Sequence, residues 1–280
     1  MCRWIAYSGQ PIFIEQLITL PEHSLVEQSI HTELNFGADG SLMGTNGDGF
    51  GLGWYSERSQ PGLYRDERPA WSNHNFHELC RQIRARIFLA HVRATTTGSV
   101  QQANCHPFKY KNWLFQHNGD VSDFGKIRRE LQLEIAPELY TELKGTTDSE
   151  TFFLLALTYG LQSDPKGGLQ KMVERVKKAL VDNGIGDGQL NLSCALSDGQ
   201  KVYTLRYAHN VMSKTQFYSS ESGWIHERNS KVSGASYFPE DNIVIVSEPL
   251  DRFDNKWNEI PDNSFSTIYQ SDVTIETFLD

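Results

Sequence analysis

Apolar residues recur along this chain in two periods, one typical of strands and the other of helices. Short apolar runs favour strands at residues 3–7, 87–92 and 113–116, because each run has the length of a strand and no helical repeat. The segment "GDGFGLGWY", residues 47–55, alternates glycine with larger side chains. This alternation predicts a strand whose glycine face lies close to other backbone or to a ligand.

Helical periods occupy other parts of the chain. In "GLQKMVERVKKALVDNG", apolar residues recur in steps of three and four, and Gly184 stands where a C-terminal cap is expected. In "GTTDSETFFLLALTYG", Thr147 and Glu150 have the spacing of a capping box ahead of a long apolar run, which predicts a buried helix. Shorter helices are predicted at residues 13–20, 24–31 and 75–84.

The second half of the chain adds paired strands. "LNLSCALSDGQKVYTLRY" predicts a hairpin that turns at Asp198 and Gly199, and residues 241–250 predict a last strand. The sequence contains no internal repeat and no stretch with the composition of a linker. Hairpin strands interrupted by two consecutive long helices predict one α+β domain, with helices layered on antiparallel sheets.

Composition narrows the classes of partner. A formal net charge of -9 argues against nucleic acid or an anionic membrane, because both require a surplus of lysine and arginine. No segment approaches the ~18 to 20 apolar residues of a membrane span, and no secretory signal is present. The four cysteines have no paired spacing, which favours a reducing compartment and a cytoplasmic location.

Cys2 is the first candidate for chemistry because of its position. Removal of Met1 ahead of a small residue would leave Cys2 at the amino terminus. Its α-amino group, with an ordinary pKa of about 7.7 to 8.0, could then act as general base for its own thiol. Elsewhere in a chain such a cysteine is usually an inert small hydrophobe, and that interpretation stays open here.

Three further segments place polar residues beside predicted strands. In "HVRATTTG", Arg93 is either a surface residue or a bidentate binder of a carboxylate. In "QHNGD", Asn118 and Gly119 predict a turn after the strand at 113–116, and their amide donors could also form an oxyanion hole. In "TTDSE", Asp148 is either a first-turn residue favoured by the helix dipole or a partner for the ammonium group of an amino acid.

These residues, in this order, together with "NCHPF" at residues 104–108, resemble the class II glutamine amidotransferase domain of the N-terminal nucleophile hydrolases. "GDGFGLGWY" and "VSEPL" are similar to stand-alone members, which include the ergothioneine-synthesis amidohydrolase and glutathione-degrading relatives. The resemblance implies a four-layer αββα sandwich of two antiparallel sheets. It implies a single domain over residues 1–280, with a core at 2–250 and a C-terminal extension at 251–280.

The resemblance also implies roles. Cys2 would attack the side-chain amide of glutamine or of a γ-glutamyl compound and form a γ-glutamyl thioester. Asn118 and Gly119 would stabilise the oxyanion, while Arg93 and Asp148 would bind the α-carboxylate and α-amino groups of the substrate. Thr95 and His106 fall in segments beside the pocket. No cofactor and no metal are implied; Ala94 departs from the aromatic residue that many members carry after the arginine.

Several alternatives remain at this stage. The chain lacks room for an acceptor-binding domain. Either water is the acceptor, or ammonia passes to a separate acceptor or synthetase chain. A homo-oligomer is also possible at this stage. A catalytically retired binding module would keep the fold without activity. A zinc-dependent hydrolase built on His91, Cys105, His106 and His117 is disfavoured, because their spacings match no metal motif, and His91 and His117 are interpreted as buried hydrogen-bonding histidines.

Overall fold

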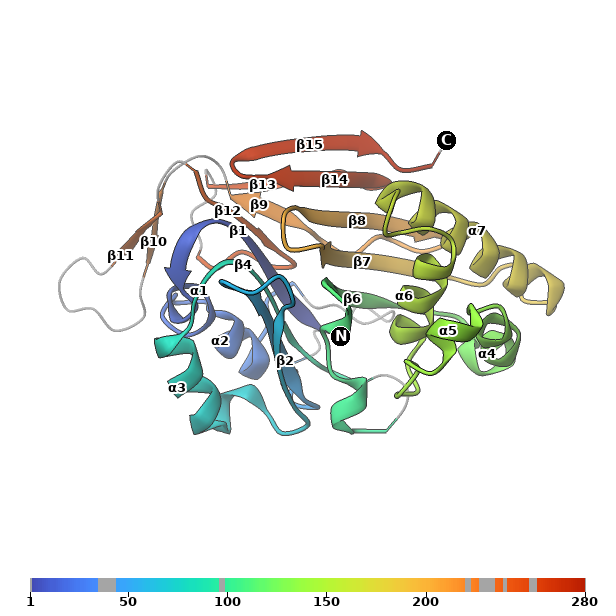
Figure 1. The fold of residues 1–280 in the computed structure, drawn as a ribbon, viewed down its shortest axis with the longest axis horizontal. Coiled ribbons are helices and arrows are strands. Elements are labelled where there is room, and N and C mark those ends of the chain that lie inside the picture. The colour runs from blue at the N-terminus through green and yellow to red at the C-terminus, as the bar shows by residue number, and fades with distance from the viewer. Residues whose placement is uncertain are drawn as a thin grey trace.

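Two antiparallel sheets lie face to face, and helices cover the outer side of each (Figure 1). The computed structural model describes residues 2–34, 44–95, 99–219, 223–226, 235–238, 241–251 and 256–279. Met1 and residues 96–98 of the "HVRATTTG" segment lie outside the described residues.

The strands and helices have the following bounds. The strands are β1 (Arg3–Phe13), β2 (Phe50–Tyr55), β3 (Gly62–Asp66), β4 (Arg84–Val92), β5 (Phe108–Tyr110), β6 (Trp113–Val121), β7 (Leu190–Ser197), β8 (Val202–His209), β9 (Phe217–Ser219), β10 (Gly223–His226), β11 (Ala235–Phe238), β12 (Ile243–Val246), β13 (Trp257–Glu259), β14 (Ser264–Tyr269) and β15 (Asp272–Thr277). The helices are α1 (Glu15–Ile18), α2 (Leu25–Ile30), α3 (His74–Gln82), α4 (Phe124–Leu133), α5 (Pro137–Tyr140), α6 (Asp148–Thr158) and α7 (Pro165–Asp182), with 3-10 turns η1 (Ala70–Ser72) and η2 (Gln102–Asn104).

The strand order explains how distant segments meet. The seven-stranded sheet runs β13-β9-β12-β1-β4-β2-β3, so β1 lies between β12 and β4. The six-stranded sheet runs β15-β14-β8-β7-β6-β5, and β10 pairs with β11 as a separate hairpin. The predicted C-terminal extension thus contributes strands to both large sheets.

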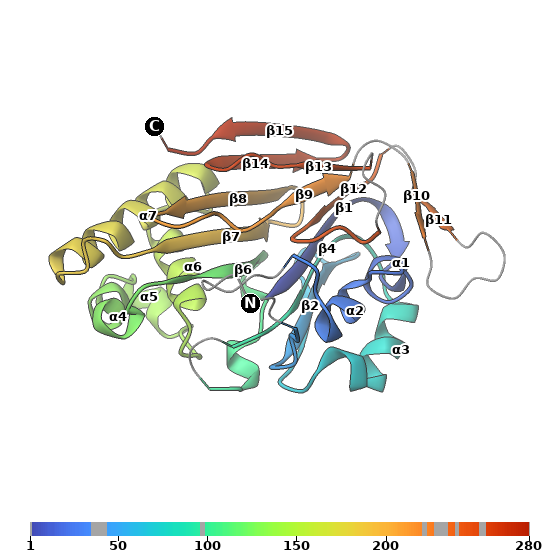
Figure 2. The ribbon, with the colours of Figure 1, turned by 180° about the vertical axis from the view of Figure 1, so that it is seen from behind.

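Three apolar clusters fill the layers. Helices α1–α3 bury Leu17, Leu25 and Phe76 against the outer face of the seven-stranded sheet. Helices α4–α7 cover the six-stranded sheet with a larger cluster, and both views place them on the opposite side of the molecule from α1–α3 (Figure 2). A third cluster, which includes Trp4 and Leu114, lies between the sheets. The predicted αββα sandwich is confirmed.

Local sequence features account for several boundaries. Gly199 turns the β7–β8 hairpin at φ +86°, a conformation that side chains rarely adopt. On β2, a Cβ at Gly51 would lie 2.2 Å from the carbonyl oxygen of His106, which confirms the expected close approach of backbone to the glycine face. None of the helices in the described ranges combines the length and the apolar composition that a membrane span requires.

Two expectations about local structure were wrong. Asn118 and Gly119 do not form a turn; β6 continues through them to Val121, because β7 pairs with it residue by residue up to Leu190. Thr147 caps α6 by accepting from the Glu150 N–H at 3.2 Å, but the Glu150 carboxylate does not complete the capping box. It accepts instead from the N–H groups of Lys144 and Gly145.

Candidate functional site

Cys2 lies directly before β1, at the edge of the space between the two sheets. Trp4 points into this space and donates from Nε1 to Ser193 Oγ on β7 at 3.2 Å. Because side chains alternate along a strand, Cys2 faces the same space as Trp4. Cys2 is a half-buried residue, and its thiol donates to the carbonyl oxygen of Ala94 at 3.7 Å. The other three cysteines are buried, and all four are free.

The surroundings of Cys2 keep its thiol protonated. Burial raises the pKa of the Cys2 thiol above its ordinary value, against the effects of the amino-terminal charge, the Ala94 hydrogen bond and the charges of Arg93 and Arg3. A thiol is a poor nucleophile while it holds its proton. Attack by this sulfur therefore requires a base close to it.

Strand β6 passes beside the first residues of β1. Gln116 Nε2 donates to the Ile5 carbonyl at 2.9 Å, and Figure 1 shows β1 beginning next to β6. Asn118 lies two residues further along β6, so its side chain faces the same intersheet space. It is 1% exposed, and its Nδ2 has no hydrogen-bond partner among the described residues. This amide is a donor available to a ligand, since buried polar groups are normally paired.

Gly119 is required by a close approach of backbone. A Cβ at this position would lie 1.9 Å from the carbonyl oxygen of Asn191 and 2.4 Å from His117 Nε2. No larger residue fits without displacing β7. Asn118 and Gly119 thus come from the interior of a paired strand, which holds their donors more rigidly than a turn would.

Arg93 directly follows β4 and is 3% exposed. Its NH1 donates to the carbonyl oxygens of Asp48 at 3.3 Å and Ser99 at 3.4 Å. In the described part of the chain, Arg93 has no carboxylate within salt-bridge distance. A buried guanidinium held by neutral carbonyls keeps its positive charge available for an anionic ligand.

The sequence did not reveal how the Arg93 segment is held. Asp48 donates its N–H to the Arg93 carbonyl at 2.9 Å, and its carboxylate accepts from the N–H of Thr95 at 2.8 Å. Thr95 Oγ1 is buried and has no partner within the described residues. Asp48 therefore fixes the backbone on both sides of Ala94, the residue whose carbonyl accepts from Cys2.

Asp148 connects to β6 through a residue that the sequence did not single out. The Ser149 N–H donates to Asp148 Oδ1 at 2.6 Å, and Ser149 Oγ lies 3.0 Å from the same oxygen and 2.8 Å from His117 Nδ1. His117 Nε2 donates to the Asn191 carbonyl at 3.1 Å, because a carbonyl oxygen can only accept. The chain of contacts links the half-buried Asp148 to the residue before Asn118. Among the described residues, no hydrogen bond or ion pair joins Asp148 to Cys2 or Arg93.

Two neighbouring histidine rings, tilted by 34° to each other, border the same region. The rings of His91 and His106 lie 4.2 Å apart, and His91 Nε2 lies 3.2 Å from the His117 carbonyl oxygen. Burial lowers the pKa of His91 to about 3 and that of His106 well below its ordinary value, so both rings are neutral. Both nitrogens of His106 lack partners among the described residues. The interpretation of His91 and His117 as buried hydrogen-bonding histidines is confirmed.

Cys2, Arg93 and Thr95 lie at one end of β1 and β4, with the His106 ring against His91, and the contacts of Gln116 and His117 place Asn118 and Gly119 on the part of β6 beside these strands. Asp148 reaches this region through Ser149 and His117. Within the described ranges, no group of three or more histidine, cysteine, aspartate or glutamate side chains is placed to hold a metal ion.

Comparisons with known proteins agree on one family. Residues 15–278 match the family model described as glutamine amidotransferases class-II. The chain is 33% identical to a probable glutamine amidotransferase, DUG3, of Saccharomyces cerevisiae, over 100% of this chain and 85% of that protein. It is 24% identical to the γ-glutamyl-hercynylcysteine sulfoxide hydrolase of Mycolicibacterium smegmatis, over 98% of this chain and 99% of that one.

Solved structures extend the likeness to the fold. A glutamine aminotransferase class-II domain protein from Silicibacter pomeroyi superposes with a TM-score of 0.69 at 31% identity, over the full length of both chains. The glutamine phosphoribosylpyrophosphate amidotransferase of Bacillus subtilis superposes with a TM-score of 0.64 at 12% identity, over 99% of this chain and 49% of that one. At that identity the second likeness shows the fold alone.

Proposed function

This chain belongs to the class II glutamine amidotransferase family, and we propose that it hydrolyses the side-chain amide of glutamine or of a γ-glutamyl compound with Cys2 as nucleophile. The observation that carries the proposal is the buried Asn118 Nδ2, which has no hydrogen-bond partner among the described residues and lies on the side of β6 that faces the same intersheet space as Cys2. The expected resemblance to this family is confirmed; the roles of individual residues are part of the proposal.

The first half of the reaction breaks the amide. The free α-amino group of Cys2, after removal of Met1, takes the thiol proton while the sulfur attacks the side-chain carbonyl carbon. Asn118 Nδ2 and the Gly119 N–H donate to the oxyanion that forms. The C–N bond then breaks, the proton passes from the amine of Cys2 to the departing nitrogen, and a γ-glutamyl thioester remains.

The second half releases the enzyme. Water attacks the thioester carbon and gives a proton to the amine of Cys2. The C–S bond breaks, the sulfur recovers the proton, and glutamate or its equivalent leaves. The raised pKa of the Cys2 thiol supports this assignment, because a protonated thiol needs the adjacent base in order to react.

The substrate's amino-acid end would be held by Arg93 and Asp148. The guanidinium of Arg93 is buried and bonded to neutral carbonyls, which suits a bidentate contact with an α-carboxylate. Asp148, fixed by Ser149 on the first turn of α6, supplies an anion for the α-ammonium group. Thr95 Oγ1 and the His106 nitrogens are proposed to complete the pocket wall, since they have no protein partner among the described residues.

The direct test is glutamate release from glutamine, glutathione and γ-glutamyl thioethers. Wild-type protein is expected to release glutamate from at least one of them, and Cys2→Ala is expected to lose at least about 10⁴-fold in turnover. Cys80→Ala removes a buried thiol from α3 and should retain wild-type turnover. Equal background release by wild type and Cys2→Ala would instead indicate a retired binding module.

Two variants test the finer assignments. A fused N-terminal tag that is not removed should abolish turnover, because an amide nitrogen cannot act as the base; full activity with the tag, checked by intact mass, would contradict the mechanism. Arg93→Lys should raise KM for glutamine about tenfold or more through loss of the paired hydrogen bonds. An unchanged KM would remove Arg93 from the substrate site.

The identity of the acceptor is also open to measurement. Release of free ammonia by the isolated chain would support water as the acceptor. Turnover that appears only when a second protein is added would support a separate acceptor or synthetase chain.

A further inference from the structure

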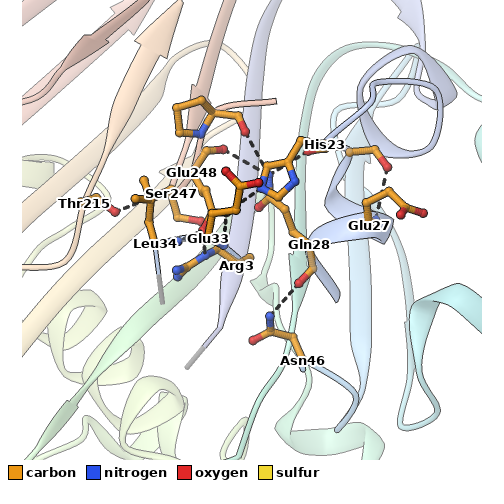
Figure 3. A network of polar contacts seen from close by, with 12 residues as sticks. Arg3, His23, Glu27, Gln28, Glu33, Leu34, Asn46, Thr215, Ser247 and Glu248 are labelled. Atoms are coloured by element: carbon orange, nitrogen blue, oxygen red, sulfur yellow. Dashed lines mark hydrogen bonds and ion pairs between the residues drawn. The ribbon is translucent and has the colours of Figure 1, made fainter. Parts of the chain in front are cut away.

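Glu248 occupies a buried position two residues after β12, where four segments of the chain meet (Figure 3). Its Oε2 accepts from Arg3 Nε at 2.7 Å and from the Leu34 N–H at 3.1 Å. Its Oε1 accepts from His23 Nε2 at 2.5 Å and from the Glu33 N–H at 2.8 Å. Both carboxylate oxygens are therefore fully engaged, and the side chain is only 2% exposed.

The environment keeps Glu248 ionised. Burial alone would raise the pKa of this carboxyl, but the hydrogen bond from His23, the charge of Arg3 and the Glu33 N–H outweigh burial and lower the pKa to about 2. Arg3 is also 2% exposed. Two buried charges paired in this way hold each other in one geometry, because separating them would leave an uncompensated charge out of water.

Arg3, held in place by Glu248, also contacts Cys2. Its NH1 donates to the carbonyl oxygen of Cys2 at 2.9 Å. Regular pairing of β1 ends before Cys2: the last pair with β12 is Ile5 with Val246, and the last with β4 is Arg3 with Val92. The Cys2 carbonyl is thus held by a side chain at a point where neither sheet neighbour continues the ladder.

The carbonyl direction matters because it fixes the rotation about the Cα–C bond of Cys2. This rotation sets the direction of the α-amino nitrogen, which the proposed mechanism uses as base for the thiol on the same residue. We propose that Arg3 and Glu248 form a positioning pair that orients Cys2, with Glu248 acting through Arg3. The inference rests on the proposed function, in which Cys2 supplies both nucleophile and base.

Ser247 supports the same end of β1 from the other side. Its Oγ accepts from the Trp4 N–H at 3.0 Å, and its own N–H donates to the Trp4 carbonyl at 3.1 Å. Ser247 therefore holds the backbone of Trp4 by two hydrogen bonds, while Glu248 holds Cys2 indirectly through Arg3. This gives a physical role to the "VSEPL" segment that the resemblance includes.

The test compares Arg3→Met, Glu248→Gln and their double variant with Arg206→Met. Arg206 is a matched control, because its NH1 also joins a carboxylate, Glu259, to a backbone carbonyl, that of Ile260. Arg3→Met is expected to lower kcat for glutamine by about 10- to 100-fold and to change KM by less than about threefold, since Arg3 does not touch substrate. Arg206→Met is expected to change neither constant.

Because Glu248 acts through Arg3, the double variant should be no slower than Arg3→Met alone, within about threefold. A double variant whose loss equals the product of the two single losses would contradict the proposed order of action. An Arg3→Met protein with wild-type kcat would overturn the proposal.

A second readout does not depend on turnover. Cys2 is half-buried and the other cysteines are buried, so iodoacetamide at pH 7 should label Cys2 selectively. Arg3→Met should slow this labelling several-fold, because an α-amino group that is no longer oriented toward the thiol is a poorer base for it. Unchanged labelling of Cys2 in Arg3→Met would overturn the proposed positioning pair. Failure of the wild-type protein to release glutamate from any substrate would refute only the proposed function, so the two failures can be told apart.

Labelling of Cys80, Cys105 or Cys194 in Arg3→Met would reveal a loosened fold. Arg3→Lys then separates a loosened fold from a lost positioning contact. It keeps the positive charge, but a single ammonium group cannot bridge Glu248 and the Cys2 carbonyl as the planar guanidinium does. Arg3→Lys should leave these three cysteines unlabelled and still lose kcat about tenfold or more. Wild-type kcat in that variant would overturn the proposal.

Discussion

The helix-covered face of the six-stranded sheet and the space between the two sheets are both buried, but their chemistry differs. Under α4–α7 the cluster is built from apolar side chains such as Phe115, Phe153 and Met172. The intersheet space combines Trp4 and Leu114 with polar residues. Several of these keep a polar atom without a partner among the described residues: His91 Nδ1, Gln116 Oε1, Asn118 Nδ2 and Thr204 Oγ1.

The difference separates stability from reactivity. An apolar layer gains free energy from every methylene it buries, and it has little to offer a polar substrate. A layer with unpaired donors gives up some of that free energy and keeps groups that a reacting carbonyl can use. The comparison predicts that substitutions in the apolar layer lower stability and leave turnover unchanged, whereas substitutions in the intersheet space lower turnover and change stability little.

The largest effect on stability is expected in the apolar layer. Met172→Ala on α7 should lower the free energy of unfolding by about 2 to 5 kcal/mol, because Met172 is fully buried and leaves a cavity. Turnover per folded molecule should not change. Urea unfolding and kcat measure the two quantities, and Glu174→Ala, on the exposed face of the same helix, is the control. A large loss of kcat in folded Met172→Ala would break the comparison.

The opposite signature is expected for Asn118→Ala. Loss of one oxyanion donor should lower kcat by about 10² to 10³, or roughly 3 to 4 kcal/mol, with little loss of stability because Nδ2 has no hydrogen-bond partner among the described residues. Steady-state kinetics and thermal unfolding test this. Asn112→Ala, before β6, removes an amide that donates to the Asp198 carbonyl and should leave kcat unchanged. An Asn118→Ala protein that is unstable yet fully active would reverse our assignment.

Acid should affect the intersheet space first. The pKa of His91 is lowered to about 3, so its contribution to stability is complete above the ordinary histidine pKa of 6.5 and is lost as pH falls toward 3. His91→Gln should therefore reduce the acid dependence of the unfolding free energy by about 1 kcal/mol per pH unit below 6.5. Urea unfolding at pH 7, 6 and 5 measures it. The exposed His74→Gln should keep the wild-type slope; an unchanged slope in His91→Gln would show that other groups carry the acid sensitivity.

The smallest effect is expected where the two layers meet. Thr147 caps α6, the helix that carries Asp148 and Ser149. Thr147→Ala should cost about 1 kcal/mol of stability and raise KM for glutamine slightly without changing kcat. Thermal unfolding and steady-state kinetics check both, with Thr147→Ser, which keeps the capping oxygen, as the control. A kcat loss as large as that of Asn118→Ala would place Thr147 itself in the reactive layer.

Much of the architecture could be predicted from the sequence. The period of two at β2, the Asp198–Gly199 hairpin and the helical steps along α7 depend on neighbours a few residues apart, so the local pattern is sufficient. The ordered motifs around Cys2, Arg93 and Asn118 also identified the family.

Tertiary contacts decided the rest. Asn118 and Gly119 carry a turn sequence, but pairing with β7, more than seventy residues later, keeps them in a strand. Ser149 has no sequence signal that distinguishes it from any helix serine; only the approach of α6 to β6 places its hydroxyl on His117.

The sequence by itself therefore determined many of the strands and helices and which side chains are able to react, because these properties depend on local periods and on residue chemistry. Only the folded chain decided which of these side chains face one another. Arg3 and Glu248, 245 residues apart, illustrate the reason: their contact exists because β1 pairs with β12, and no local pattern encodes that pairing.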